Sequence, residues 1–228
     1  MKVGCLFSGG KDSTYSLYLA KQMGLSIECL LTLIPHSDES YLFHFPNTWI
    51  TSIQSQALQI PIITIKIQSS SIDEEDKSLD NLIKIAIKDY QIEGIIHGGI
   101  SSNFQKKKFY GICKKHSLKL ISPIWQVNQY EYMTKLLTNN FLIKIVGISA
   151  MGLELKWLGT NLNFTNLRIL NDLSNRYGFN LSFEGGEGET LVLDCPIFKK
   201  KLEIRKSNPI WDGQRGILEI SDIILIDK

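Results

Sequence analysis

Short runs rich in Ile, Leu and Val alternate with longer segments of mixed polarity over the first two-thirds of the chain. The apolar runs have the length and composition of buried parallel strands, at residues 2–7, 27–34, 62–67, 94–97 and 141–148. The segments between them are predicted to be helices, at residues 11–23, 48–58, 72–90, 102–116 and 129–139. This alternation predicts an α/β fold with a doubly wound, mostly parallel sheet, which binds ligands at the carboxyl ends of its strands.

Polar residues at the helix boundaries agree with these assignments. Four acidic residues, 73–76, fall in the first turn of the third helix, where negative charge favours the helix dipole. Asn47 and Asn128 stand where N-caps of the second and fifth helices are expected.

The pattern changes after about Gly152. A helix is predicted at residues 166–177, and short strands at 190–194, 201–205 and 217–226. Polar turns are expected at Asn208-Pro209 and Asp212-Gly213. We therefore expect a larger domain over residues 1–150 and a smaller C-terminal α+β lobe over residues 151–228.

The overall composition argues against a membrane protein and against a strongly basic protein, and it excludes little else. Of the 228 residues 43% are hydrophobic, enough for a sizeable core, and the formal net charge is only +2. Such a balance does not indicate nucleic acid or an anionic membrane as a required partner. No apolar run approaches a membrane span, and the N-terminus reads as a strand rather than a signal peptide.

The cysteines indicate a reducing compartment. The chain has four, and no two of them form a Cys-x-x-Cys pair, so neither a zinc ribbon nor a thioredoxin-like site is expected. Cys5 and Cys29 fall in predicted strands and are expected in the core. The cytoplasm is the simplest setting.

The segment Ser8-Gly9-Gly10-Lys11-Asp12-Ser13 joins the first predicted strand to the first predicted helix. A glycine-rich turn at a helix N-terminus presents backbone N–H groups and the positive end of the helix dipole to an anion. The serine hydroxyls add donors, and Lys11 adds a point charge. The plain alternative is a glycine-rich turn before a serine-capped helix. A Walker A loop is excluded because it needs Gly at position 5 and Ser or Thr at position 12, where this chain has Cys5 and Asp12.

This segment resembles the PP-loop of the ATP pyrophosphatases, whose pattern is Ser-Gly-Gly-x-Asp-Ser after the first strand. The resemblance implies an adenine nucleotide alpha hydrolase-like fold, ATP cleaved between its α and β phosphates, and pyrophosphate held by residues 8–13. It further implies that Asp12 organises the loop or binds Mg²⁺. The adenine is expected near Leu31 and Thr32, and Gly98 and Gly99 are expected to admit the nucleotide close to the backbone.

A second unusual segment, residues 183–196, alternates three glutamates with glycines before an apolar run that ends at Asp194. Crowded carboxylates repel one another, so stability alone does not explain the cluster of Glu184, Glu187 and Glu189. Such a cluster binds a cation, positions a magnesium ion or acts on a proton. The alternative is a solvated acidic turn.

This second segment is similar to the signature of the diphthine–ammonia ligases, a PP-loop family. The matching residues are Glu184, Gly186, Glu187, Glu189, Thr190, Asp194 and Pro196. Other family-like positions are His44, Pro46, Asn47, 56–58, Ile60, Pro61, Gly98, Ile100, Ser102, Gln105, Lys106, Pro123, Trp125 and 157–159. The chain departs from the family pattern at Gly99, Lys108, Gly188 and Cys195.

The resemblance implies ATP-dependent amidation of diphthine, a modified histidine of translation elongation factor 2, with ammonium as nitrogen donor. An acyl-adenylate would form first, with release of pyrophosphate and then AMP. Glu184, Glu187 and Glu189 would form the acceptor and ammonia site with Thr190, and Asp194 would support it. No membrane and no nucleic acid is required, and a homodimer is possible.

Two other functions stay open at this point. One is a PP-loop enzyme that adenylates a tRNA base or a small carboxylate, and the other is a nucleotide-binding module without catalysis. The lysines at 106–108, 114 and 115 read first as a solvated helix face, because no aromatics interleave at stacking spacing. His44, His97, Trp125 and Trp157 read first as structural residues.

Overall fold

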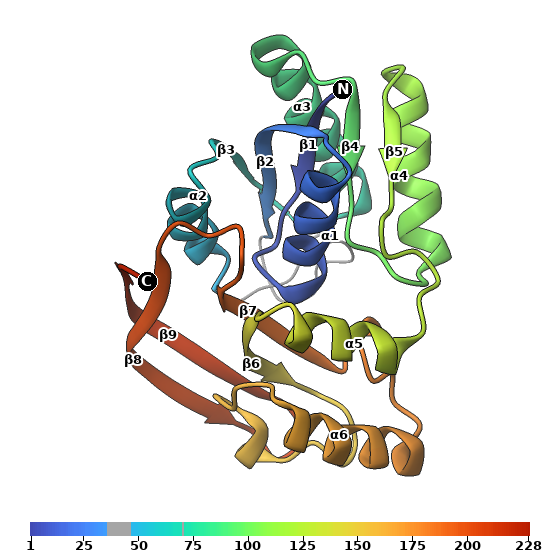
Figure 1. Ribbon diagram of the computed structural model, residues 1–228. Helices are drawn as coiled ribbons and strands as arrows, with labels where there is room; N and C mark the ends of the chain where they lie inside the picture. Colours follow the sequence, from blue (N-terminus) through green and yellow to red (C-terminus); the bar gives the residue numbers. More distant parts are fainter. Residues whose placement is uncertain (36–46, 70) are drawn as a thin grey trace. The chain divides into compact units, whose positions relative to one another are not determined.

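The computed structural model describes residues 1–35, 47–69 and 71–228 (Figure 1). The chain divides into two compact units, Met1–Trp125 and Gln126–Lys228, called unit 1 and unit 2 below. This division falls earlier than the domain boundary expected at residue 150. His44 and Pro46, two of the family-like positions, lie outside the described residues.

Unit 1 contains a five-stranded parallel sheet with the strand order β3-β2-β1-β4-β5. The strands are β1 (Lys2–Leu6), β2 (Ser26–Ile34), β3 (Ile62–Lys66), β4 (Gly94–Ile96) and β5 (Lys119–Ile121). The chain builds outward from β1 to β3 and then returns to the other side of β1 with β4. Because the winding reverses between β1 and β4, their carboxyl ends form the topological switch point where such sheets bind ligands.

Helices cover both faces of this sheet (Figure 1). They are α1 (Lys11–Gln22), α2 (Thr51–Leu58) after the 3-10 turn η1 (Thr48–Ile50), α3 (Ile72–Tyr90) and α4 (Asn103–Lys115). Leu79, Leu82 and Ile83 of α3 share one buried cluster with Phe109 of α4 and Leu31 of β2. The helices α3 and α4 therefore pack on the same face, as right-handed crossovers require.

The predicted doubly wound sheet is confirmed, but several single elements were predicted wrongly. β5 was not predicted, because it has only three residues and begins with an exposed lysine. Asn47 does not cap a helix through its side chain, since it adopts a left-handed φ of 70° before η1. The third helix has its predicted bounds, and Ser71 caps it by accepting from the N–H of Glu74.

Unit 2 contains a four-stranded antiparallel sheet with the order β7-β6-β9-β8. Its strands are β6 (Leu142–Ile148), β7 (Gly188–Asp194), β8 (Lys201–Trp211) and β9 (Gly216–Ile226). The apolar run of β6 looked like another buried parallel strand, but β6 pairs antiparallel with β7 along its length and with β9 at two residues. This pairing is the reason that the unit boundary precedes residue 150.

The helices of unit 2 are α5 (Gln129–Thr138) and α6 (Phe164–Tyr177), which lie side by side, and η2 (Leu155–Trp157) is a 3-10 turn (Figure 1). Asn128 caps α5 as predicted, accepting from the N–H of Glu131 at 3.0 Å. No helix in the described ranges combines the length and the apolar character needed to cross a membrane.

The turn at Asn208-Pro209 was wrongly predicted, because both residues lie inside β8. Pro209 is tolerated there since β8 is an edge strand, and the missing N–H costs no ladder hydrogen bond on its open side. The turn at Asp212-Gly213 is confirmed, and the Asp212 carboxylate accepts from the N–H groups of Gln214 and Arg215.

Candidate functional site

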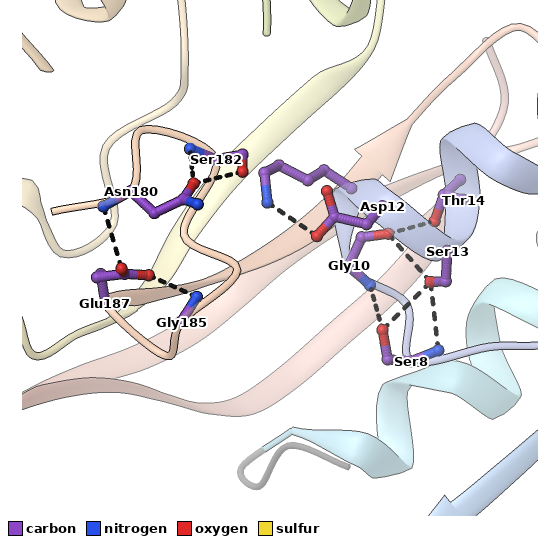
Figure 2. Close-up of polar contacts among 10 residues, drawn as sticks. Ser8, Gly10, Asp12, Ser13, Thr14, Asn180, Ser182, Gly185 and Glu187 are labelled. Carbon is purple, nitrogen blue, oxygen red and sulfur yellow. Dashed lines mark hydrogen bonds and ion pairs between the residues drawn. The ribbon is translucent and has the colours of Figure 1, made fainter. Parts of the chain in front are cut away.

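The PP-loop lies between the end of β1 and the start of α1, as predicted, and its hydroxyls bridge its own backbone (Figure 2). The N–H of Ser8 donates to Ser13 Oγ at 3.3 Å, and the N–H of Gly10 donates to Ser8 Oγ at 3.4 Å. Thr14 Oγ1 donates to the Gly10 carbonyl at 2.8 Å. The two N–H bonds are long for N–H···O hydrogen bonds and are therefore weak.

Gly9 has a conformation that only glycine adopts without strain. Its φ is +79°, and a Cβ at this position would lie 2.1 Å from Oε1 of Gln54. Gln54, fully buried on α2, donates from Nε2 to the Gly9 carbonyl at 2.9 Å. Sequence reasoning missed Gln54, because nothing in the local pattern of α2 shows that this amide reaches the first loop.

Lys11 and Asp12 form an ion pair at the start of α1. Lys11 Nζ lies 2.9 Å from Asp12 Oδ2, and the Lys11 side chain is 2% exposed while that of Asp12 is 30% exposed. The Asp12 carboxylate therefore faces solvent more than its partner does, next to the positive end of the helix dipole. A metal ion bound by Asp12 would compete with the Lys11 ammonium for this carboxylate.

Gly98 and Gly99 follow β4, and Gly98 meets the PP-loop within unit 1, whereas Gly99 lies against the His97 ring. A Cβ on Gly98 would lie 2.7 Å from both the carbonyl carbon of Asp12 and the nitrogen of Ser13. The need for glycine at position 98 thus arises first from the close approach of the PP-loop backbone. Whether the same glycines also admit a nucleotide stays a prediction.

His97 holds this turn in place. The N–H of Gly99 donates to His97 Nδ1 at 3.0 Å, which leaves the proton on Nε2, 2.7 Å from Ser122 Oγ. The ring is 1% exposed and packs on Phe109. Both ring nitrogens are used, so the structural interpretation of His97 is favoured.

Leu31 and Thr32 lie inside β2, which continues to Ile34. The Leu31 carbonyl accepts from the N–H of Phe7 at 2.9 Å, and the Thr32 hydroxyl donates to the Phe7 carbonyl at 2.6 Å. Both side chains are buried. Their observed role is to fix the chain as it enters the PP-loop, and their contact with adenine stays a prediction.

The carboxylate of Glu187 organises its own loop in unit 2 (Figure 2). Oε1 accepts from the N–H of Asn180 at 3.0 Å, and Oε2 accepts from the N–H of Gly185 at 2.7 Å. The Asn180 Oδ1 in turn accepts from the N–H and the hydroxyl of Ser182. Because both carboxylate oxygens bind backbone N–H groups, this geometry gives Glu187 a positioning role.

A second set of contacts holds the loop from the end of β6. The Glu187 carbonyl accepts from the N–H of Ser149 at 2.9 Å and from that of Ala150 at 3.3 Å. The Ser149 hydroxyl donates to the Gly186 carbonyl. Hydrogen bonds therefore hold the loop at three successive residues, 185–187. Such anchoring differs from a turn that only solvent surrounds.

The other predicted acidic residues do not all gather at this loop. Glu184 is half-buried within it, and Glu189 and Thr190 are half-buried at the start of β7, paired with Gly147 and Ile145. Asp194 ends the same strand, roughly 16 Å further on at about 3.3 Å per residue. Asp194 pairs with Lys228 at 2.6 Å, which also donates to the Cys195 carbonyl.

The cysteines are buried, and burial disfavours the thiolate form that nucleophilic chemistry needs. Burial raises the pKa of the Cys195 thiol to about 12 and that of Cys113 to about 11. Among the described residues no group of three or more His, Cys, Asp or Glu side chains is arranged to hold a metal ion. Asp12 fits Mg²⁺ only as a single protein ligand, with other oxygens from phosphates or water.

Comparison with known proteins agrees with the two-unit division. A model of the diphthamide synthase N-terminal domain matches residues 1–120, and one of the diphthamide synthase C-terminal domain matches residues 128–226. The diphthine–ammonia ligase of Bos taurus is 32% identical over 228 residues, with 92% of this chain and 85% of that protein covered. The Homo sapiens protein of the same name is 31% identical with the same coverage.

Among solved structures, the chain is similar to a predicted subunit of tRNA methyltransferase from Methanocaldococcus jannaschii. It is 15% identical, with a TM-score of 0.44, and the match covers 75% of this chain and 87% of that one. The two domain models together cover most of the chain, and two relatives are more than 30% identical to it. The chain belongs to the diphthine–ammonia ligases, a family of amide-forming ligases.

Proposed function

We propose that this protein amidates diphthine on translation elongation factor 2, using ATP and ammonium. The observation that carries the proposal is the Ser-Gly-Gly-x-Asp-Ser loop at the switch point of unit 1, in a chain that matches diphthine–ammonia ligases over both units. The acceptor and the nitrogen donor are those that the name of these relatives states.

The proposed reaction has two steps. A carboxylate is a poor electrophile, so its oxygen first attacks the α-phosphorus of ATP, and the bond to the β-phosphate breaks with release of pyrophosphate. Ammonia then attacks the carbonyl carbon of the acyl-adenylate, AMP leaves, and one proton is lost. Both steps develop negative charge on phosphate oxygens, which preorganised donors stabilise.

The residues of the PP-loop supply these donors. Backbone N–H groups of Ser8 and Gly10, together with the Ser13 hydroxyl, would cradle the β and γ phosphates at the α1 N-terminus. Lys11 would add a cationic contact, and Gly9 would let the backbone approach closely. Mg²⁺, held by Asp12 directly or through water, would neutralise phosphate charge.

The glutamate loop supplies the acceptor site. The trimethylammonium group of diphthine favours carboxylates and aromatic faces. Glu184 and Glu189 would face the acceptor or ammonia, and Glu187 would hold the loop through Asn180 and Gly185. Such a translation-factor modification belongs in the cytoplasm.

The test uses purified protein with ATP, Mg²⁺, ammonium and elongation factor 2 that bears diphthine. We expect AMP and pyrophosphate in equal amounts, together with a mass change of the acceptor from carboxylate to amide. AMP release that ignores the acceptor would redirect the assignment to a tRNA base or a small carboxylate. ATP binding without AMP under any acceptor would indicate a nucleotide-binding module.

A further inference from the structure

Positive charge is concentrated on one helix of unit 1. The 13 residues of α4 include five lysines and no acidic residue, although the whole chain has a net charge of only +2. The five are Lys106, Lys107, Lys108, Lys114 and Lys115. Like charges at this spacing destabilise an isolated helix, so folding alone does not account for them.

Three of these lysines are used within unit 1. Lys108 pairs with Asp76 at 2.6 Å, Lys115 pairs with Asp80 at 2.8 Å, and Lys106 lies 3.8 Å above the ring of Trp125. Lys107 and Lys114 are exposed, and the ion pairs found among the described residues do not include them. Their ammonium groups are therefore available to a partner.

Gly111 forms an open spot between these lysines. Its helix neighbours at three and four residues on either side are all lysines: 107, 108, 114 and 115. A Cβ on Gly111 would meet nothing within 4 Å. Glycine weakens a helix interior relative to alanine, and no contact with the described residues requires it at position 111. The backbone at Gly111 is therefore open to close approach by another molecule.

Aromatic side chains border the same surface, contrary to the sequence-based expectation. Phe104 is 54% exposed and Tyr110 is 61% exposed. At 100° per residue, Phe104, Lys107, Tyr110, Gly111 and Lys114 fall within an arc of roughly 120°. We name this surface the α4 outer face. Exposed aromatics beside complementary charge are typical of interface hot spots.

The turn that leads into α4 lies close to the PP-loop within unit 1. Gly98, whose Cα packs against the backbone of Asp12 and Ser13, lies four residues before the N-cap of α4, Ser102. The helix then extends for about 20 Å at 1.5 Å per residue. A partner bound along it would be held beside the loop proposed to bind ATP.

We infer that the α4 outer face docks an acidic segment of the protein acceptor. This inference rests on the proposed function, which requires the enzyme to recognise a whole protein rather than a free amino acid. Carboxylates match the lysines around Gly111, and apolar groups of the acceptor would cover Phe104 and Tyr110. RNA is disfavoured because unit 1 contains no arginine, the side chain best suited to phosphate recognition.

The experiment reverses the two exposed charges in Lys107→Glu/Lys114→Glu. We expect KM for the protein acceptor to rise about tenfold while kcat and the KM for ATP stay unchanged, since rim charges act on encounter. The wild-type KM should also rise with salt, and the variant's should not. The matched control is Lys77→Glu/Lys88→Glu, two exposed lysines of α3, which should leave KM unchanged.

Two further measurements keep the outcomes distinct. Direct binding of the acceptor without ATP, by fluorescence anisotropy, should weaken in parallel with KM. Should the reversed variant unfold, Lys107→Gln/Lys114→Gln replaces it. An unchanged KM for the acceptor in the variant overturns the docking inference. The inference is also overturned if the variant loses binding to a single-stranded RNA oligonucleotide but still binds the acceptor as the wild type does. A wild-type enzyme that binds the acceptor through α4 but never amidates it would overturn the proposed function instead.

Discussion

The side-chain amide of Gln54 donates a 2.9 Å hydrogen bond to the carbonyl oxygen of Gly9. This contact joins α2 to the PP-loop across 45 positions of sequence. It fixes the loop at the residue with a φ of +79°, where the backbone has its least common conformation. The shape of the proposed phosphate site therefore depends on a side chain outside the motif that identifies it.

Replacing this amide should loosen the loop. In Gln54→Leu the buried Gly9 carbonyl loses its donor, which costs about 1–3 kcal/mol. We expect a lower unfolding temperature and an increase in the KM for ATP. Gln56→Leu, at an exposed position of the same helix, is the control and should change neither. Equal ATP affinity in both variants, measured by calorimetry, would show that Gln54 only packs.

Two glycines of unit 1 should respond oppositely to alanine. In Gly98→Ala the new Cβ would lie 2.7 Å from the backbone of Asp12 and Ser13, so the PP-loop must shift and ATP binding should weaken at least tenfold. In Gly111→Ala nothing lies within 4 Å, and helix propensity should stabilise the protein by about 0.5–1 kcal/mol. Thermal unfolding with and without ATP separates the two, and a stabilised Gly98→Ala variant would contradict the packing argument.

The fold was largely predictable because its strands are short, apolar and regularly spaced. Residues 72–90 combine an acidic first turn with a long amphipathic repeat, and their helix has the predicted bounds. The strand predicted at residues 141–148, observed as β6 at Leu142–Ile148, was assigned to the wrong sheet. Its apolar pattern fits a parallel or an antiparallel partner equally, and the choice is made by Gly188–Asp194, some forty residues later.

The positions of the two candidate loops follow from motifs in the sequence, whereas the contacts that hold these loops do not. The spacing of glycines and serines in residues 8–13 predicts a phosphate-binding loop. Gln54, Ser149 and Asn180 hold the two loops through single long-range contacts, which leave no periodic signal in the sequence. Likewise, no local sequence pattern shows that Asp194 forms an ion pair with Lys228 instead of supporting the three glutamates.

Substitutions of Glu187 and Glu184 should produce different defects, one in stability and acceptor KM and the other in kcat. In Glu187→Gln one acceptor oxygen becomes an NH₂ group facing a backbone N–H, so the loop should loosen at a cost of about 1–2 kcal/mol. We expect a higher KM for the acceptor together with a lower unfolding temperature. In Glu184→Gln we expect a lower kcat with unchanged thermal stability. Full amidation by Glu187→Gln at unchanged stability would remove Glu187 from the site altogether.

Asp194 should prove structural. Asp194→Asn weakens the ion pair with Lys228, and since both groups are partly exposed the loss should be at most about 1 kcal/mol. We expect the KM for the acceptor to stay unchanged, and deletion of Lys228 should reproduce the stability loss. A raised KM in Asp194→Asn but not in the deletion would return this carboxylate to the acceptor site.

Acid should weaken the contact between α3 and α4 at Asp80. Hydrogen bonds from Lys115, Lys84 and His116 hold the pKa of the Asp80 carboxyl well below its usual range. Because the folded pKa is depressed, this carboxylate stabilises the protein above its ordinary pKa of about 3.9 and stops doing so as the pH falls below that value.

Asp80→Asn should therefore flatten the acid limb of the stability curve. Between pH 5.5 and pH 3 we expect the wild type to lose about 1 kcal/mol more than this variant, measured by urea unfolding at each pH. The value is small because Lys84 and Lys115 are 59% and 60% exposed and solvent screens them. Asp89→Asn, an exposed carboxylate on the same helix, is the control. Parallel curves for the wild type and Asp80→Asn would show that the ion-pair cluster does not contribute to acid stability.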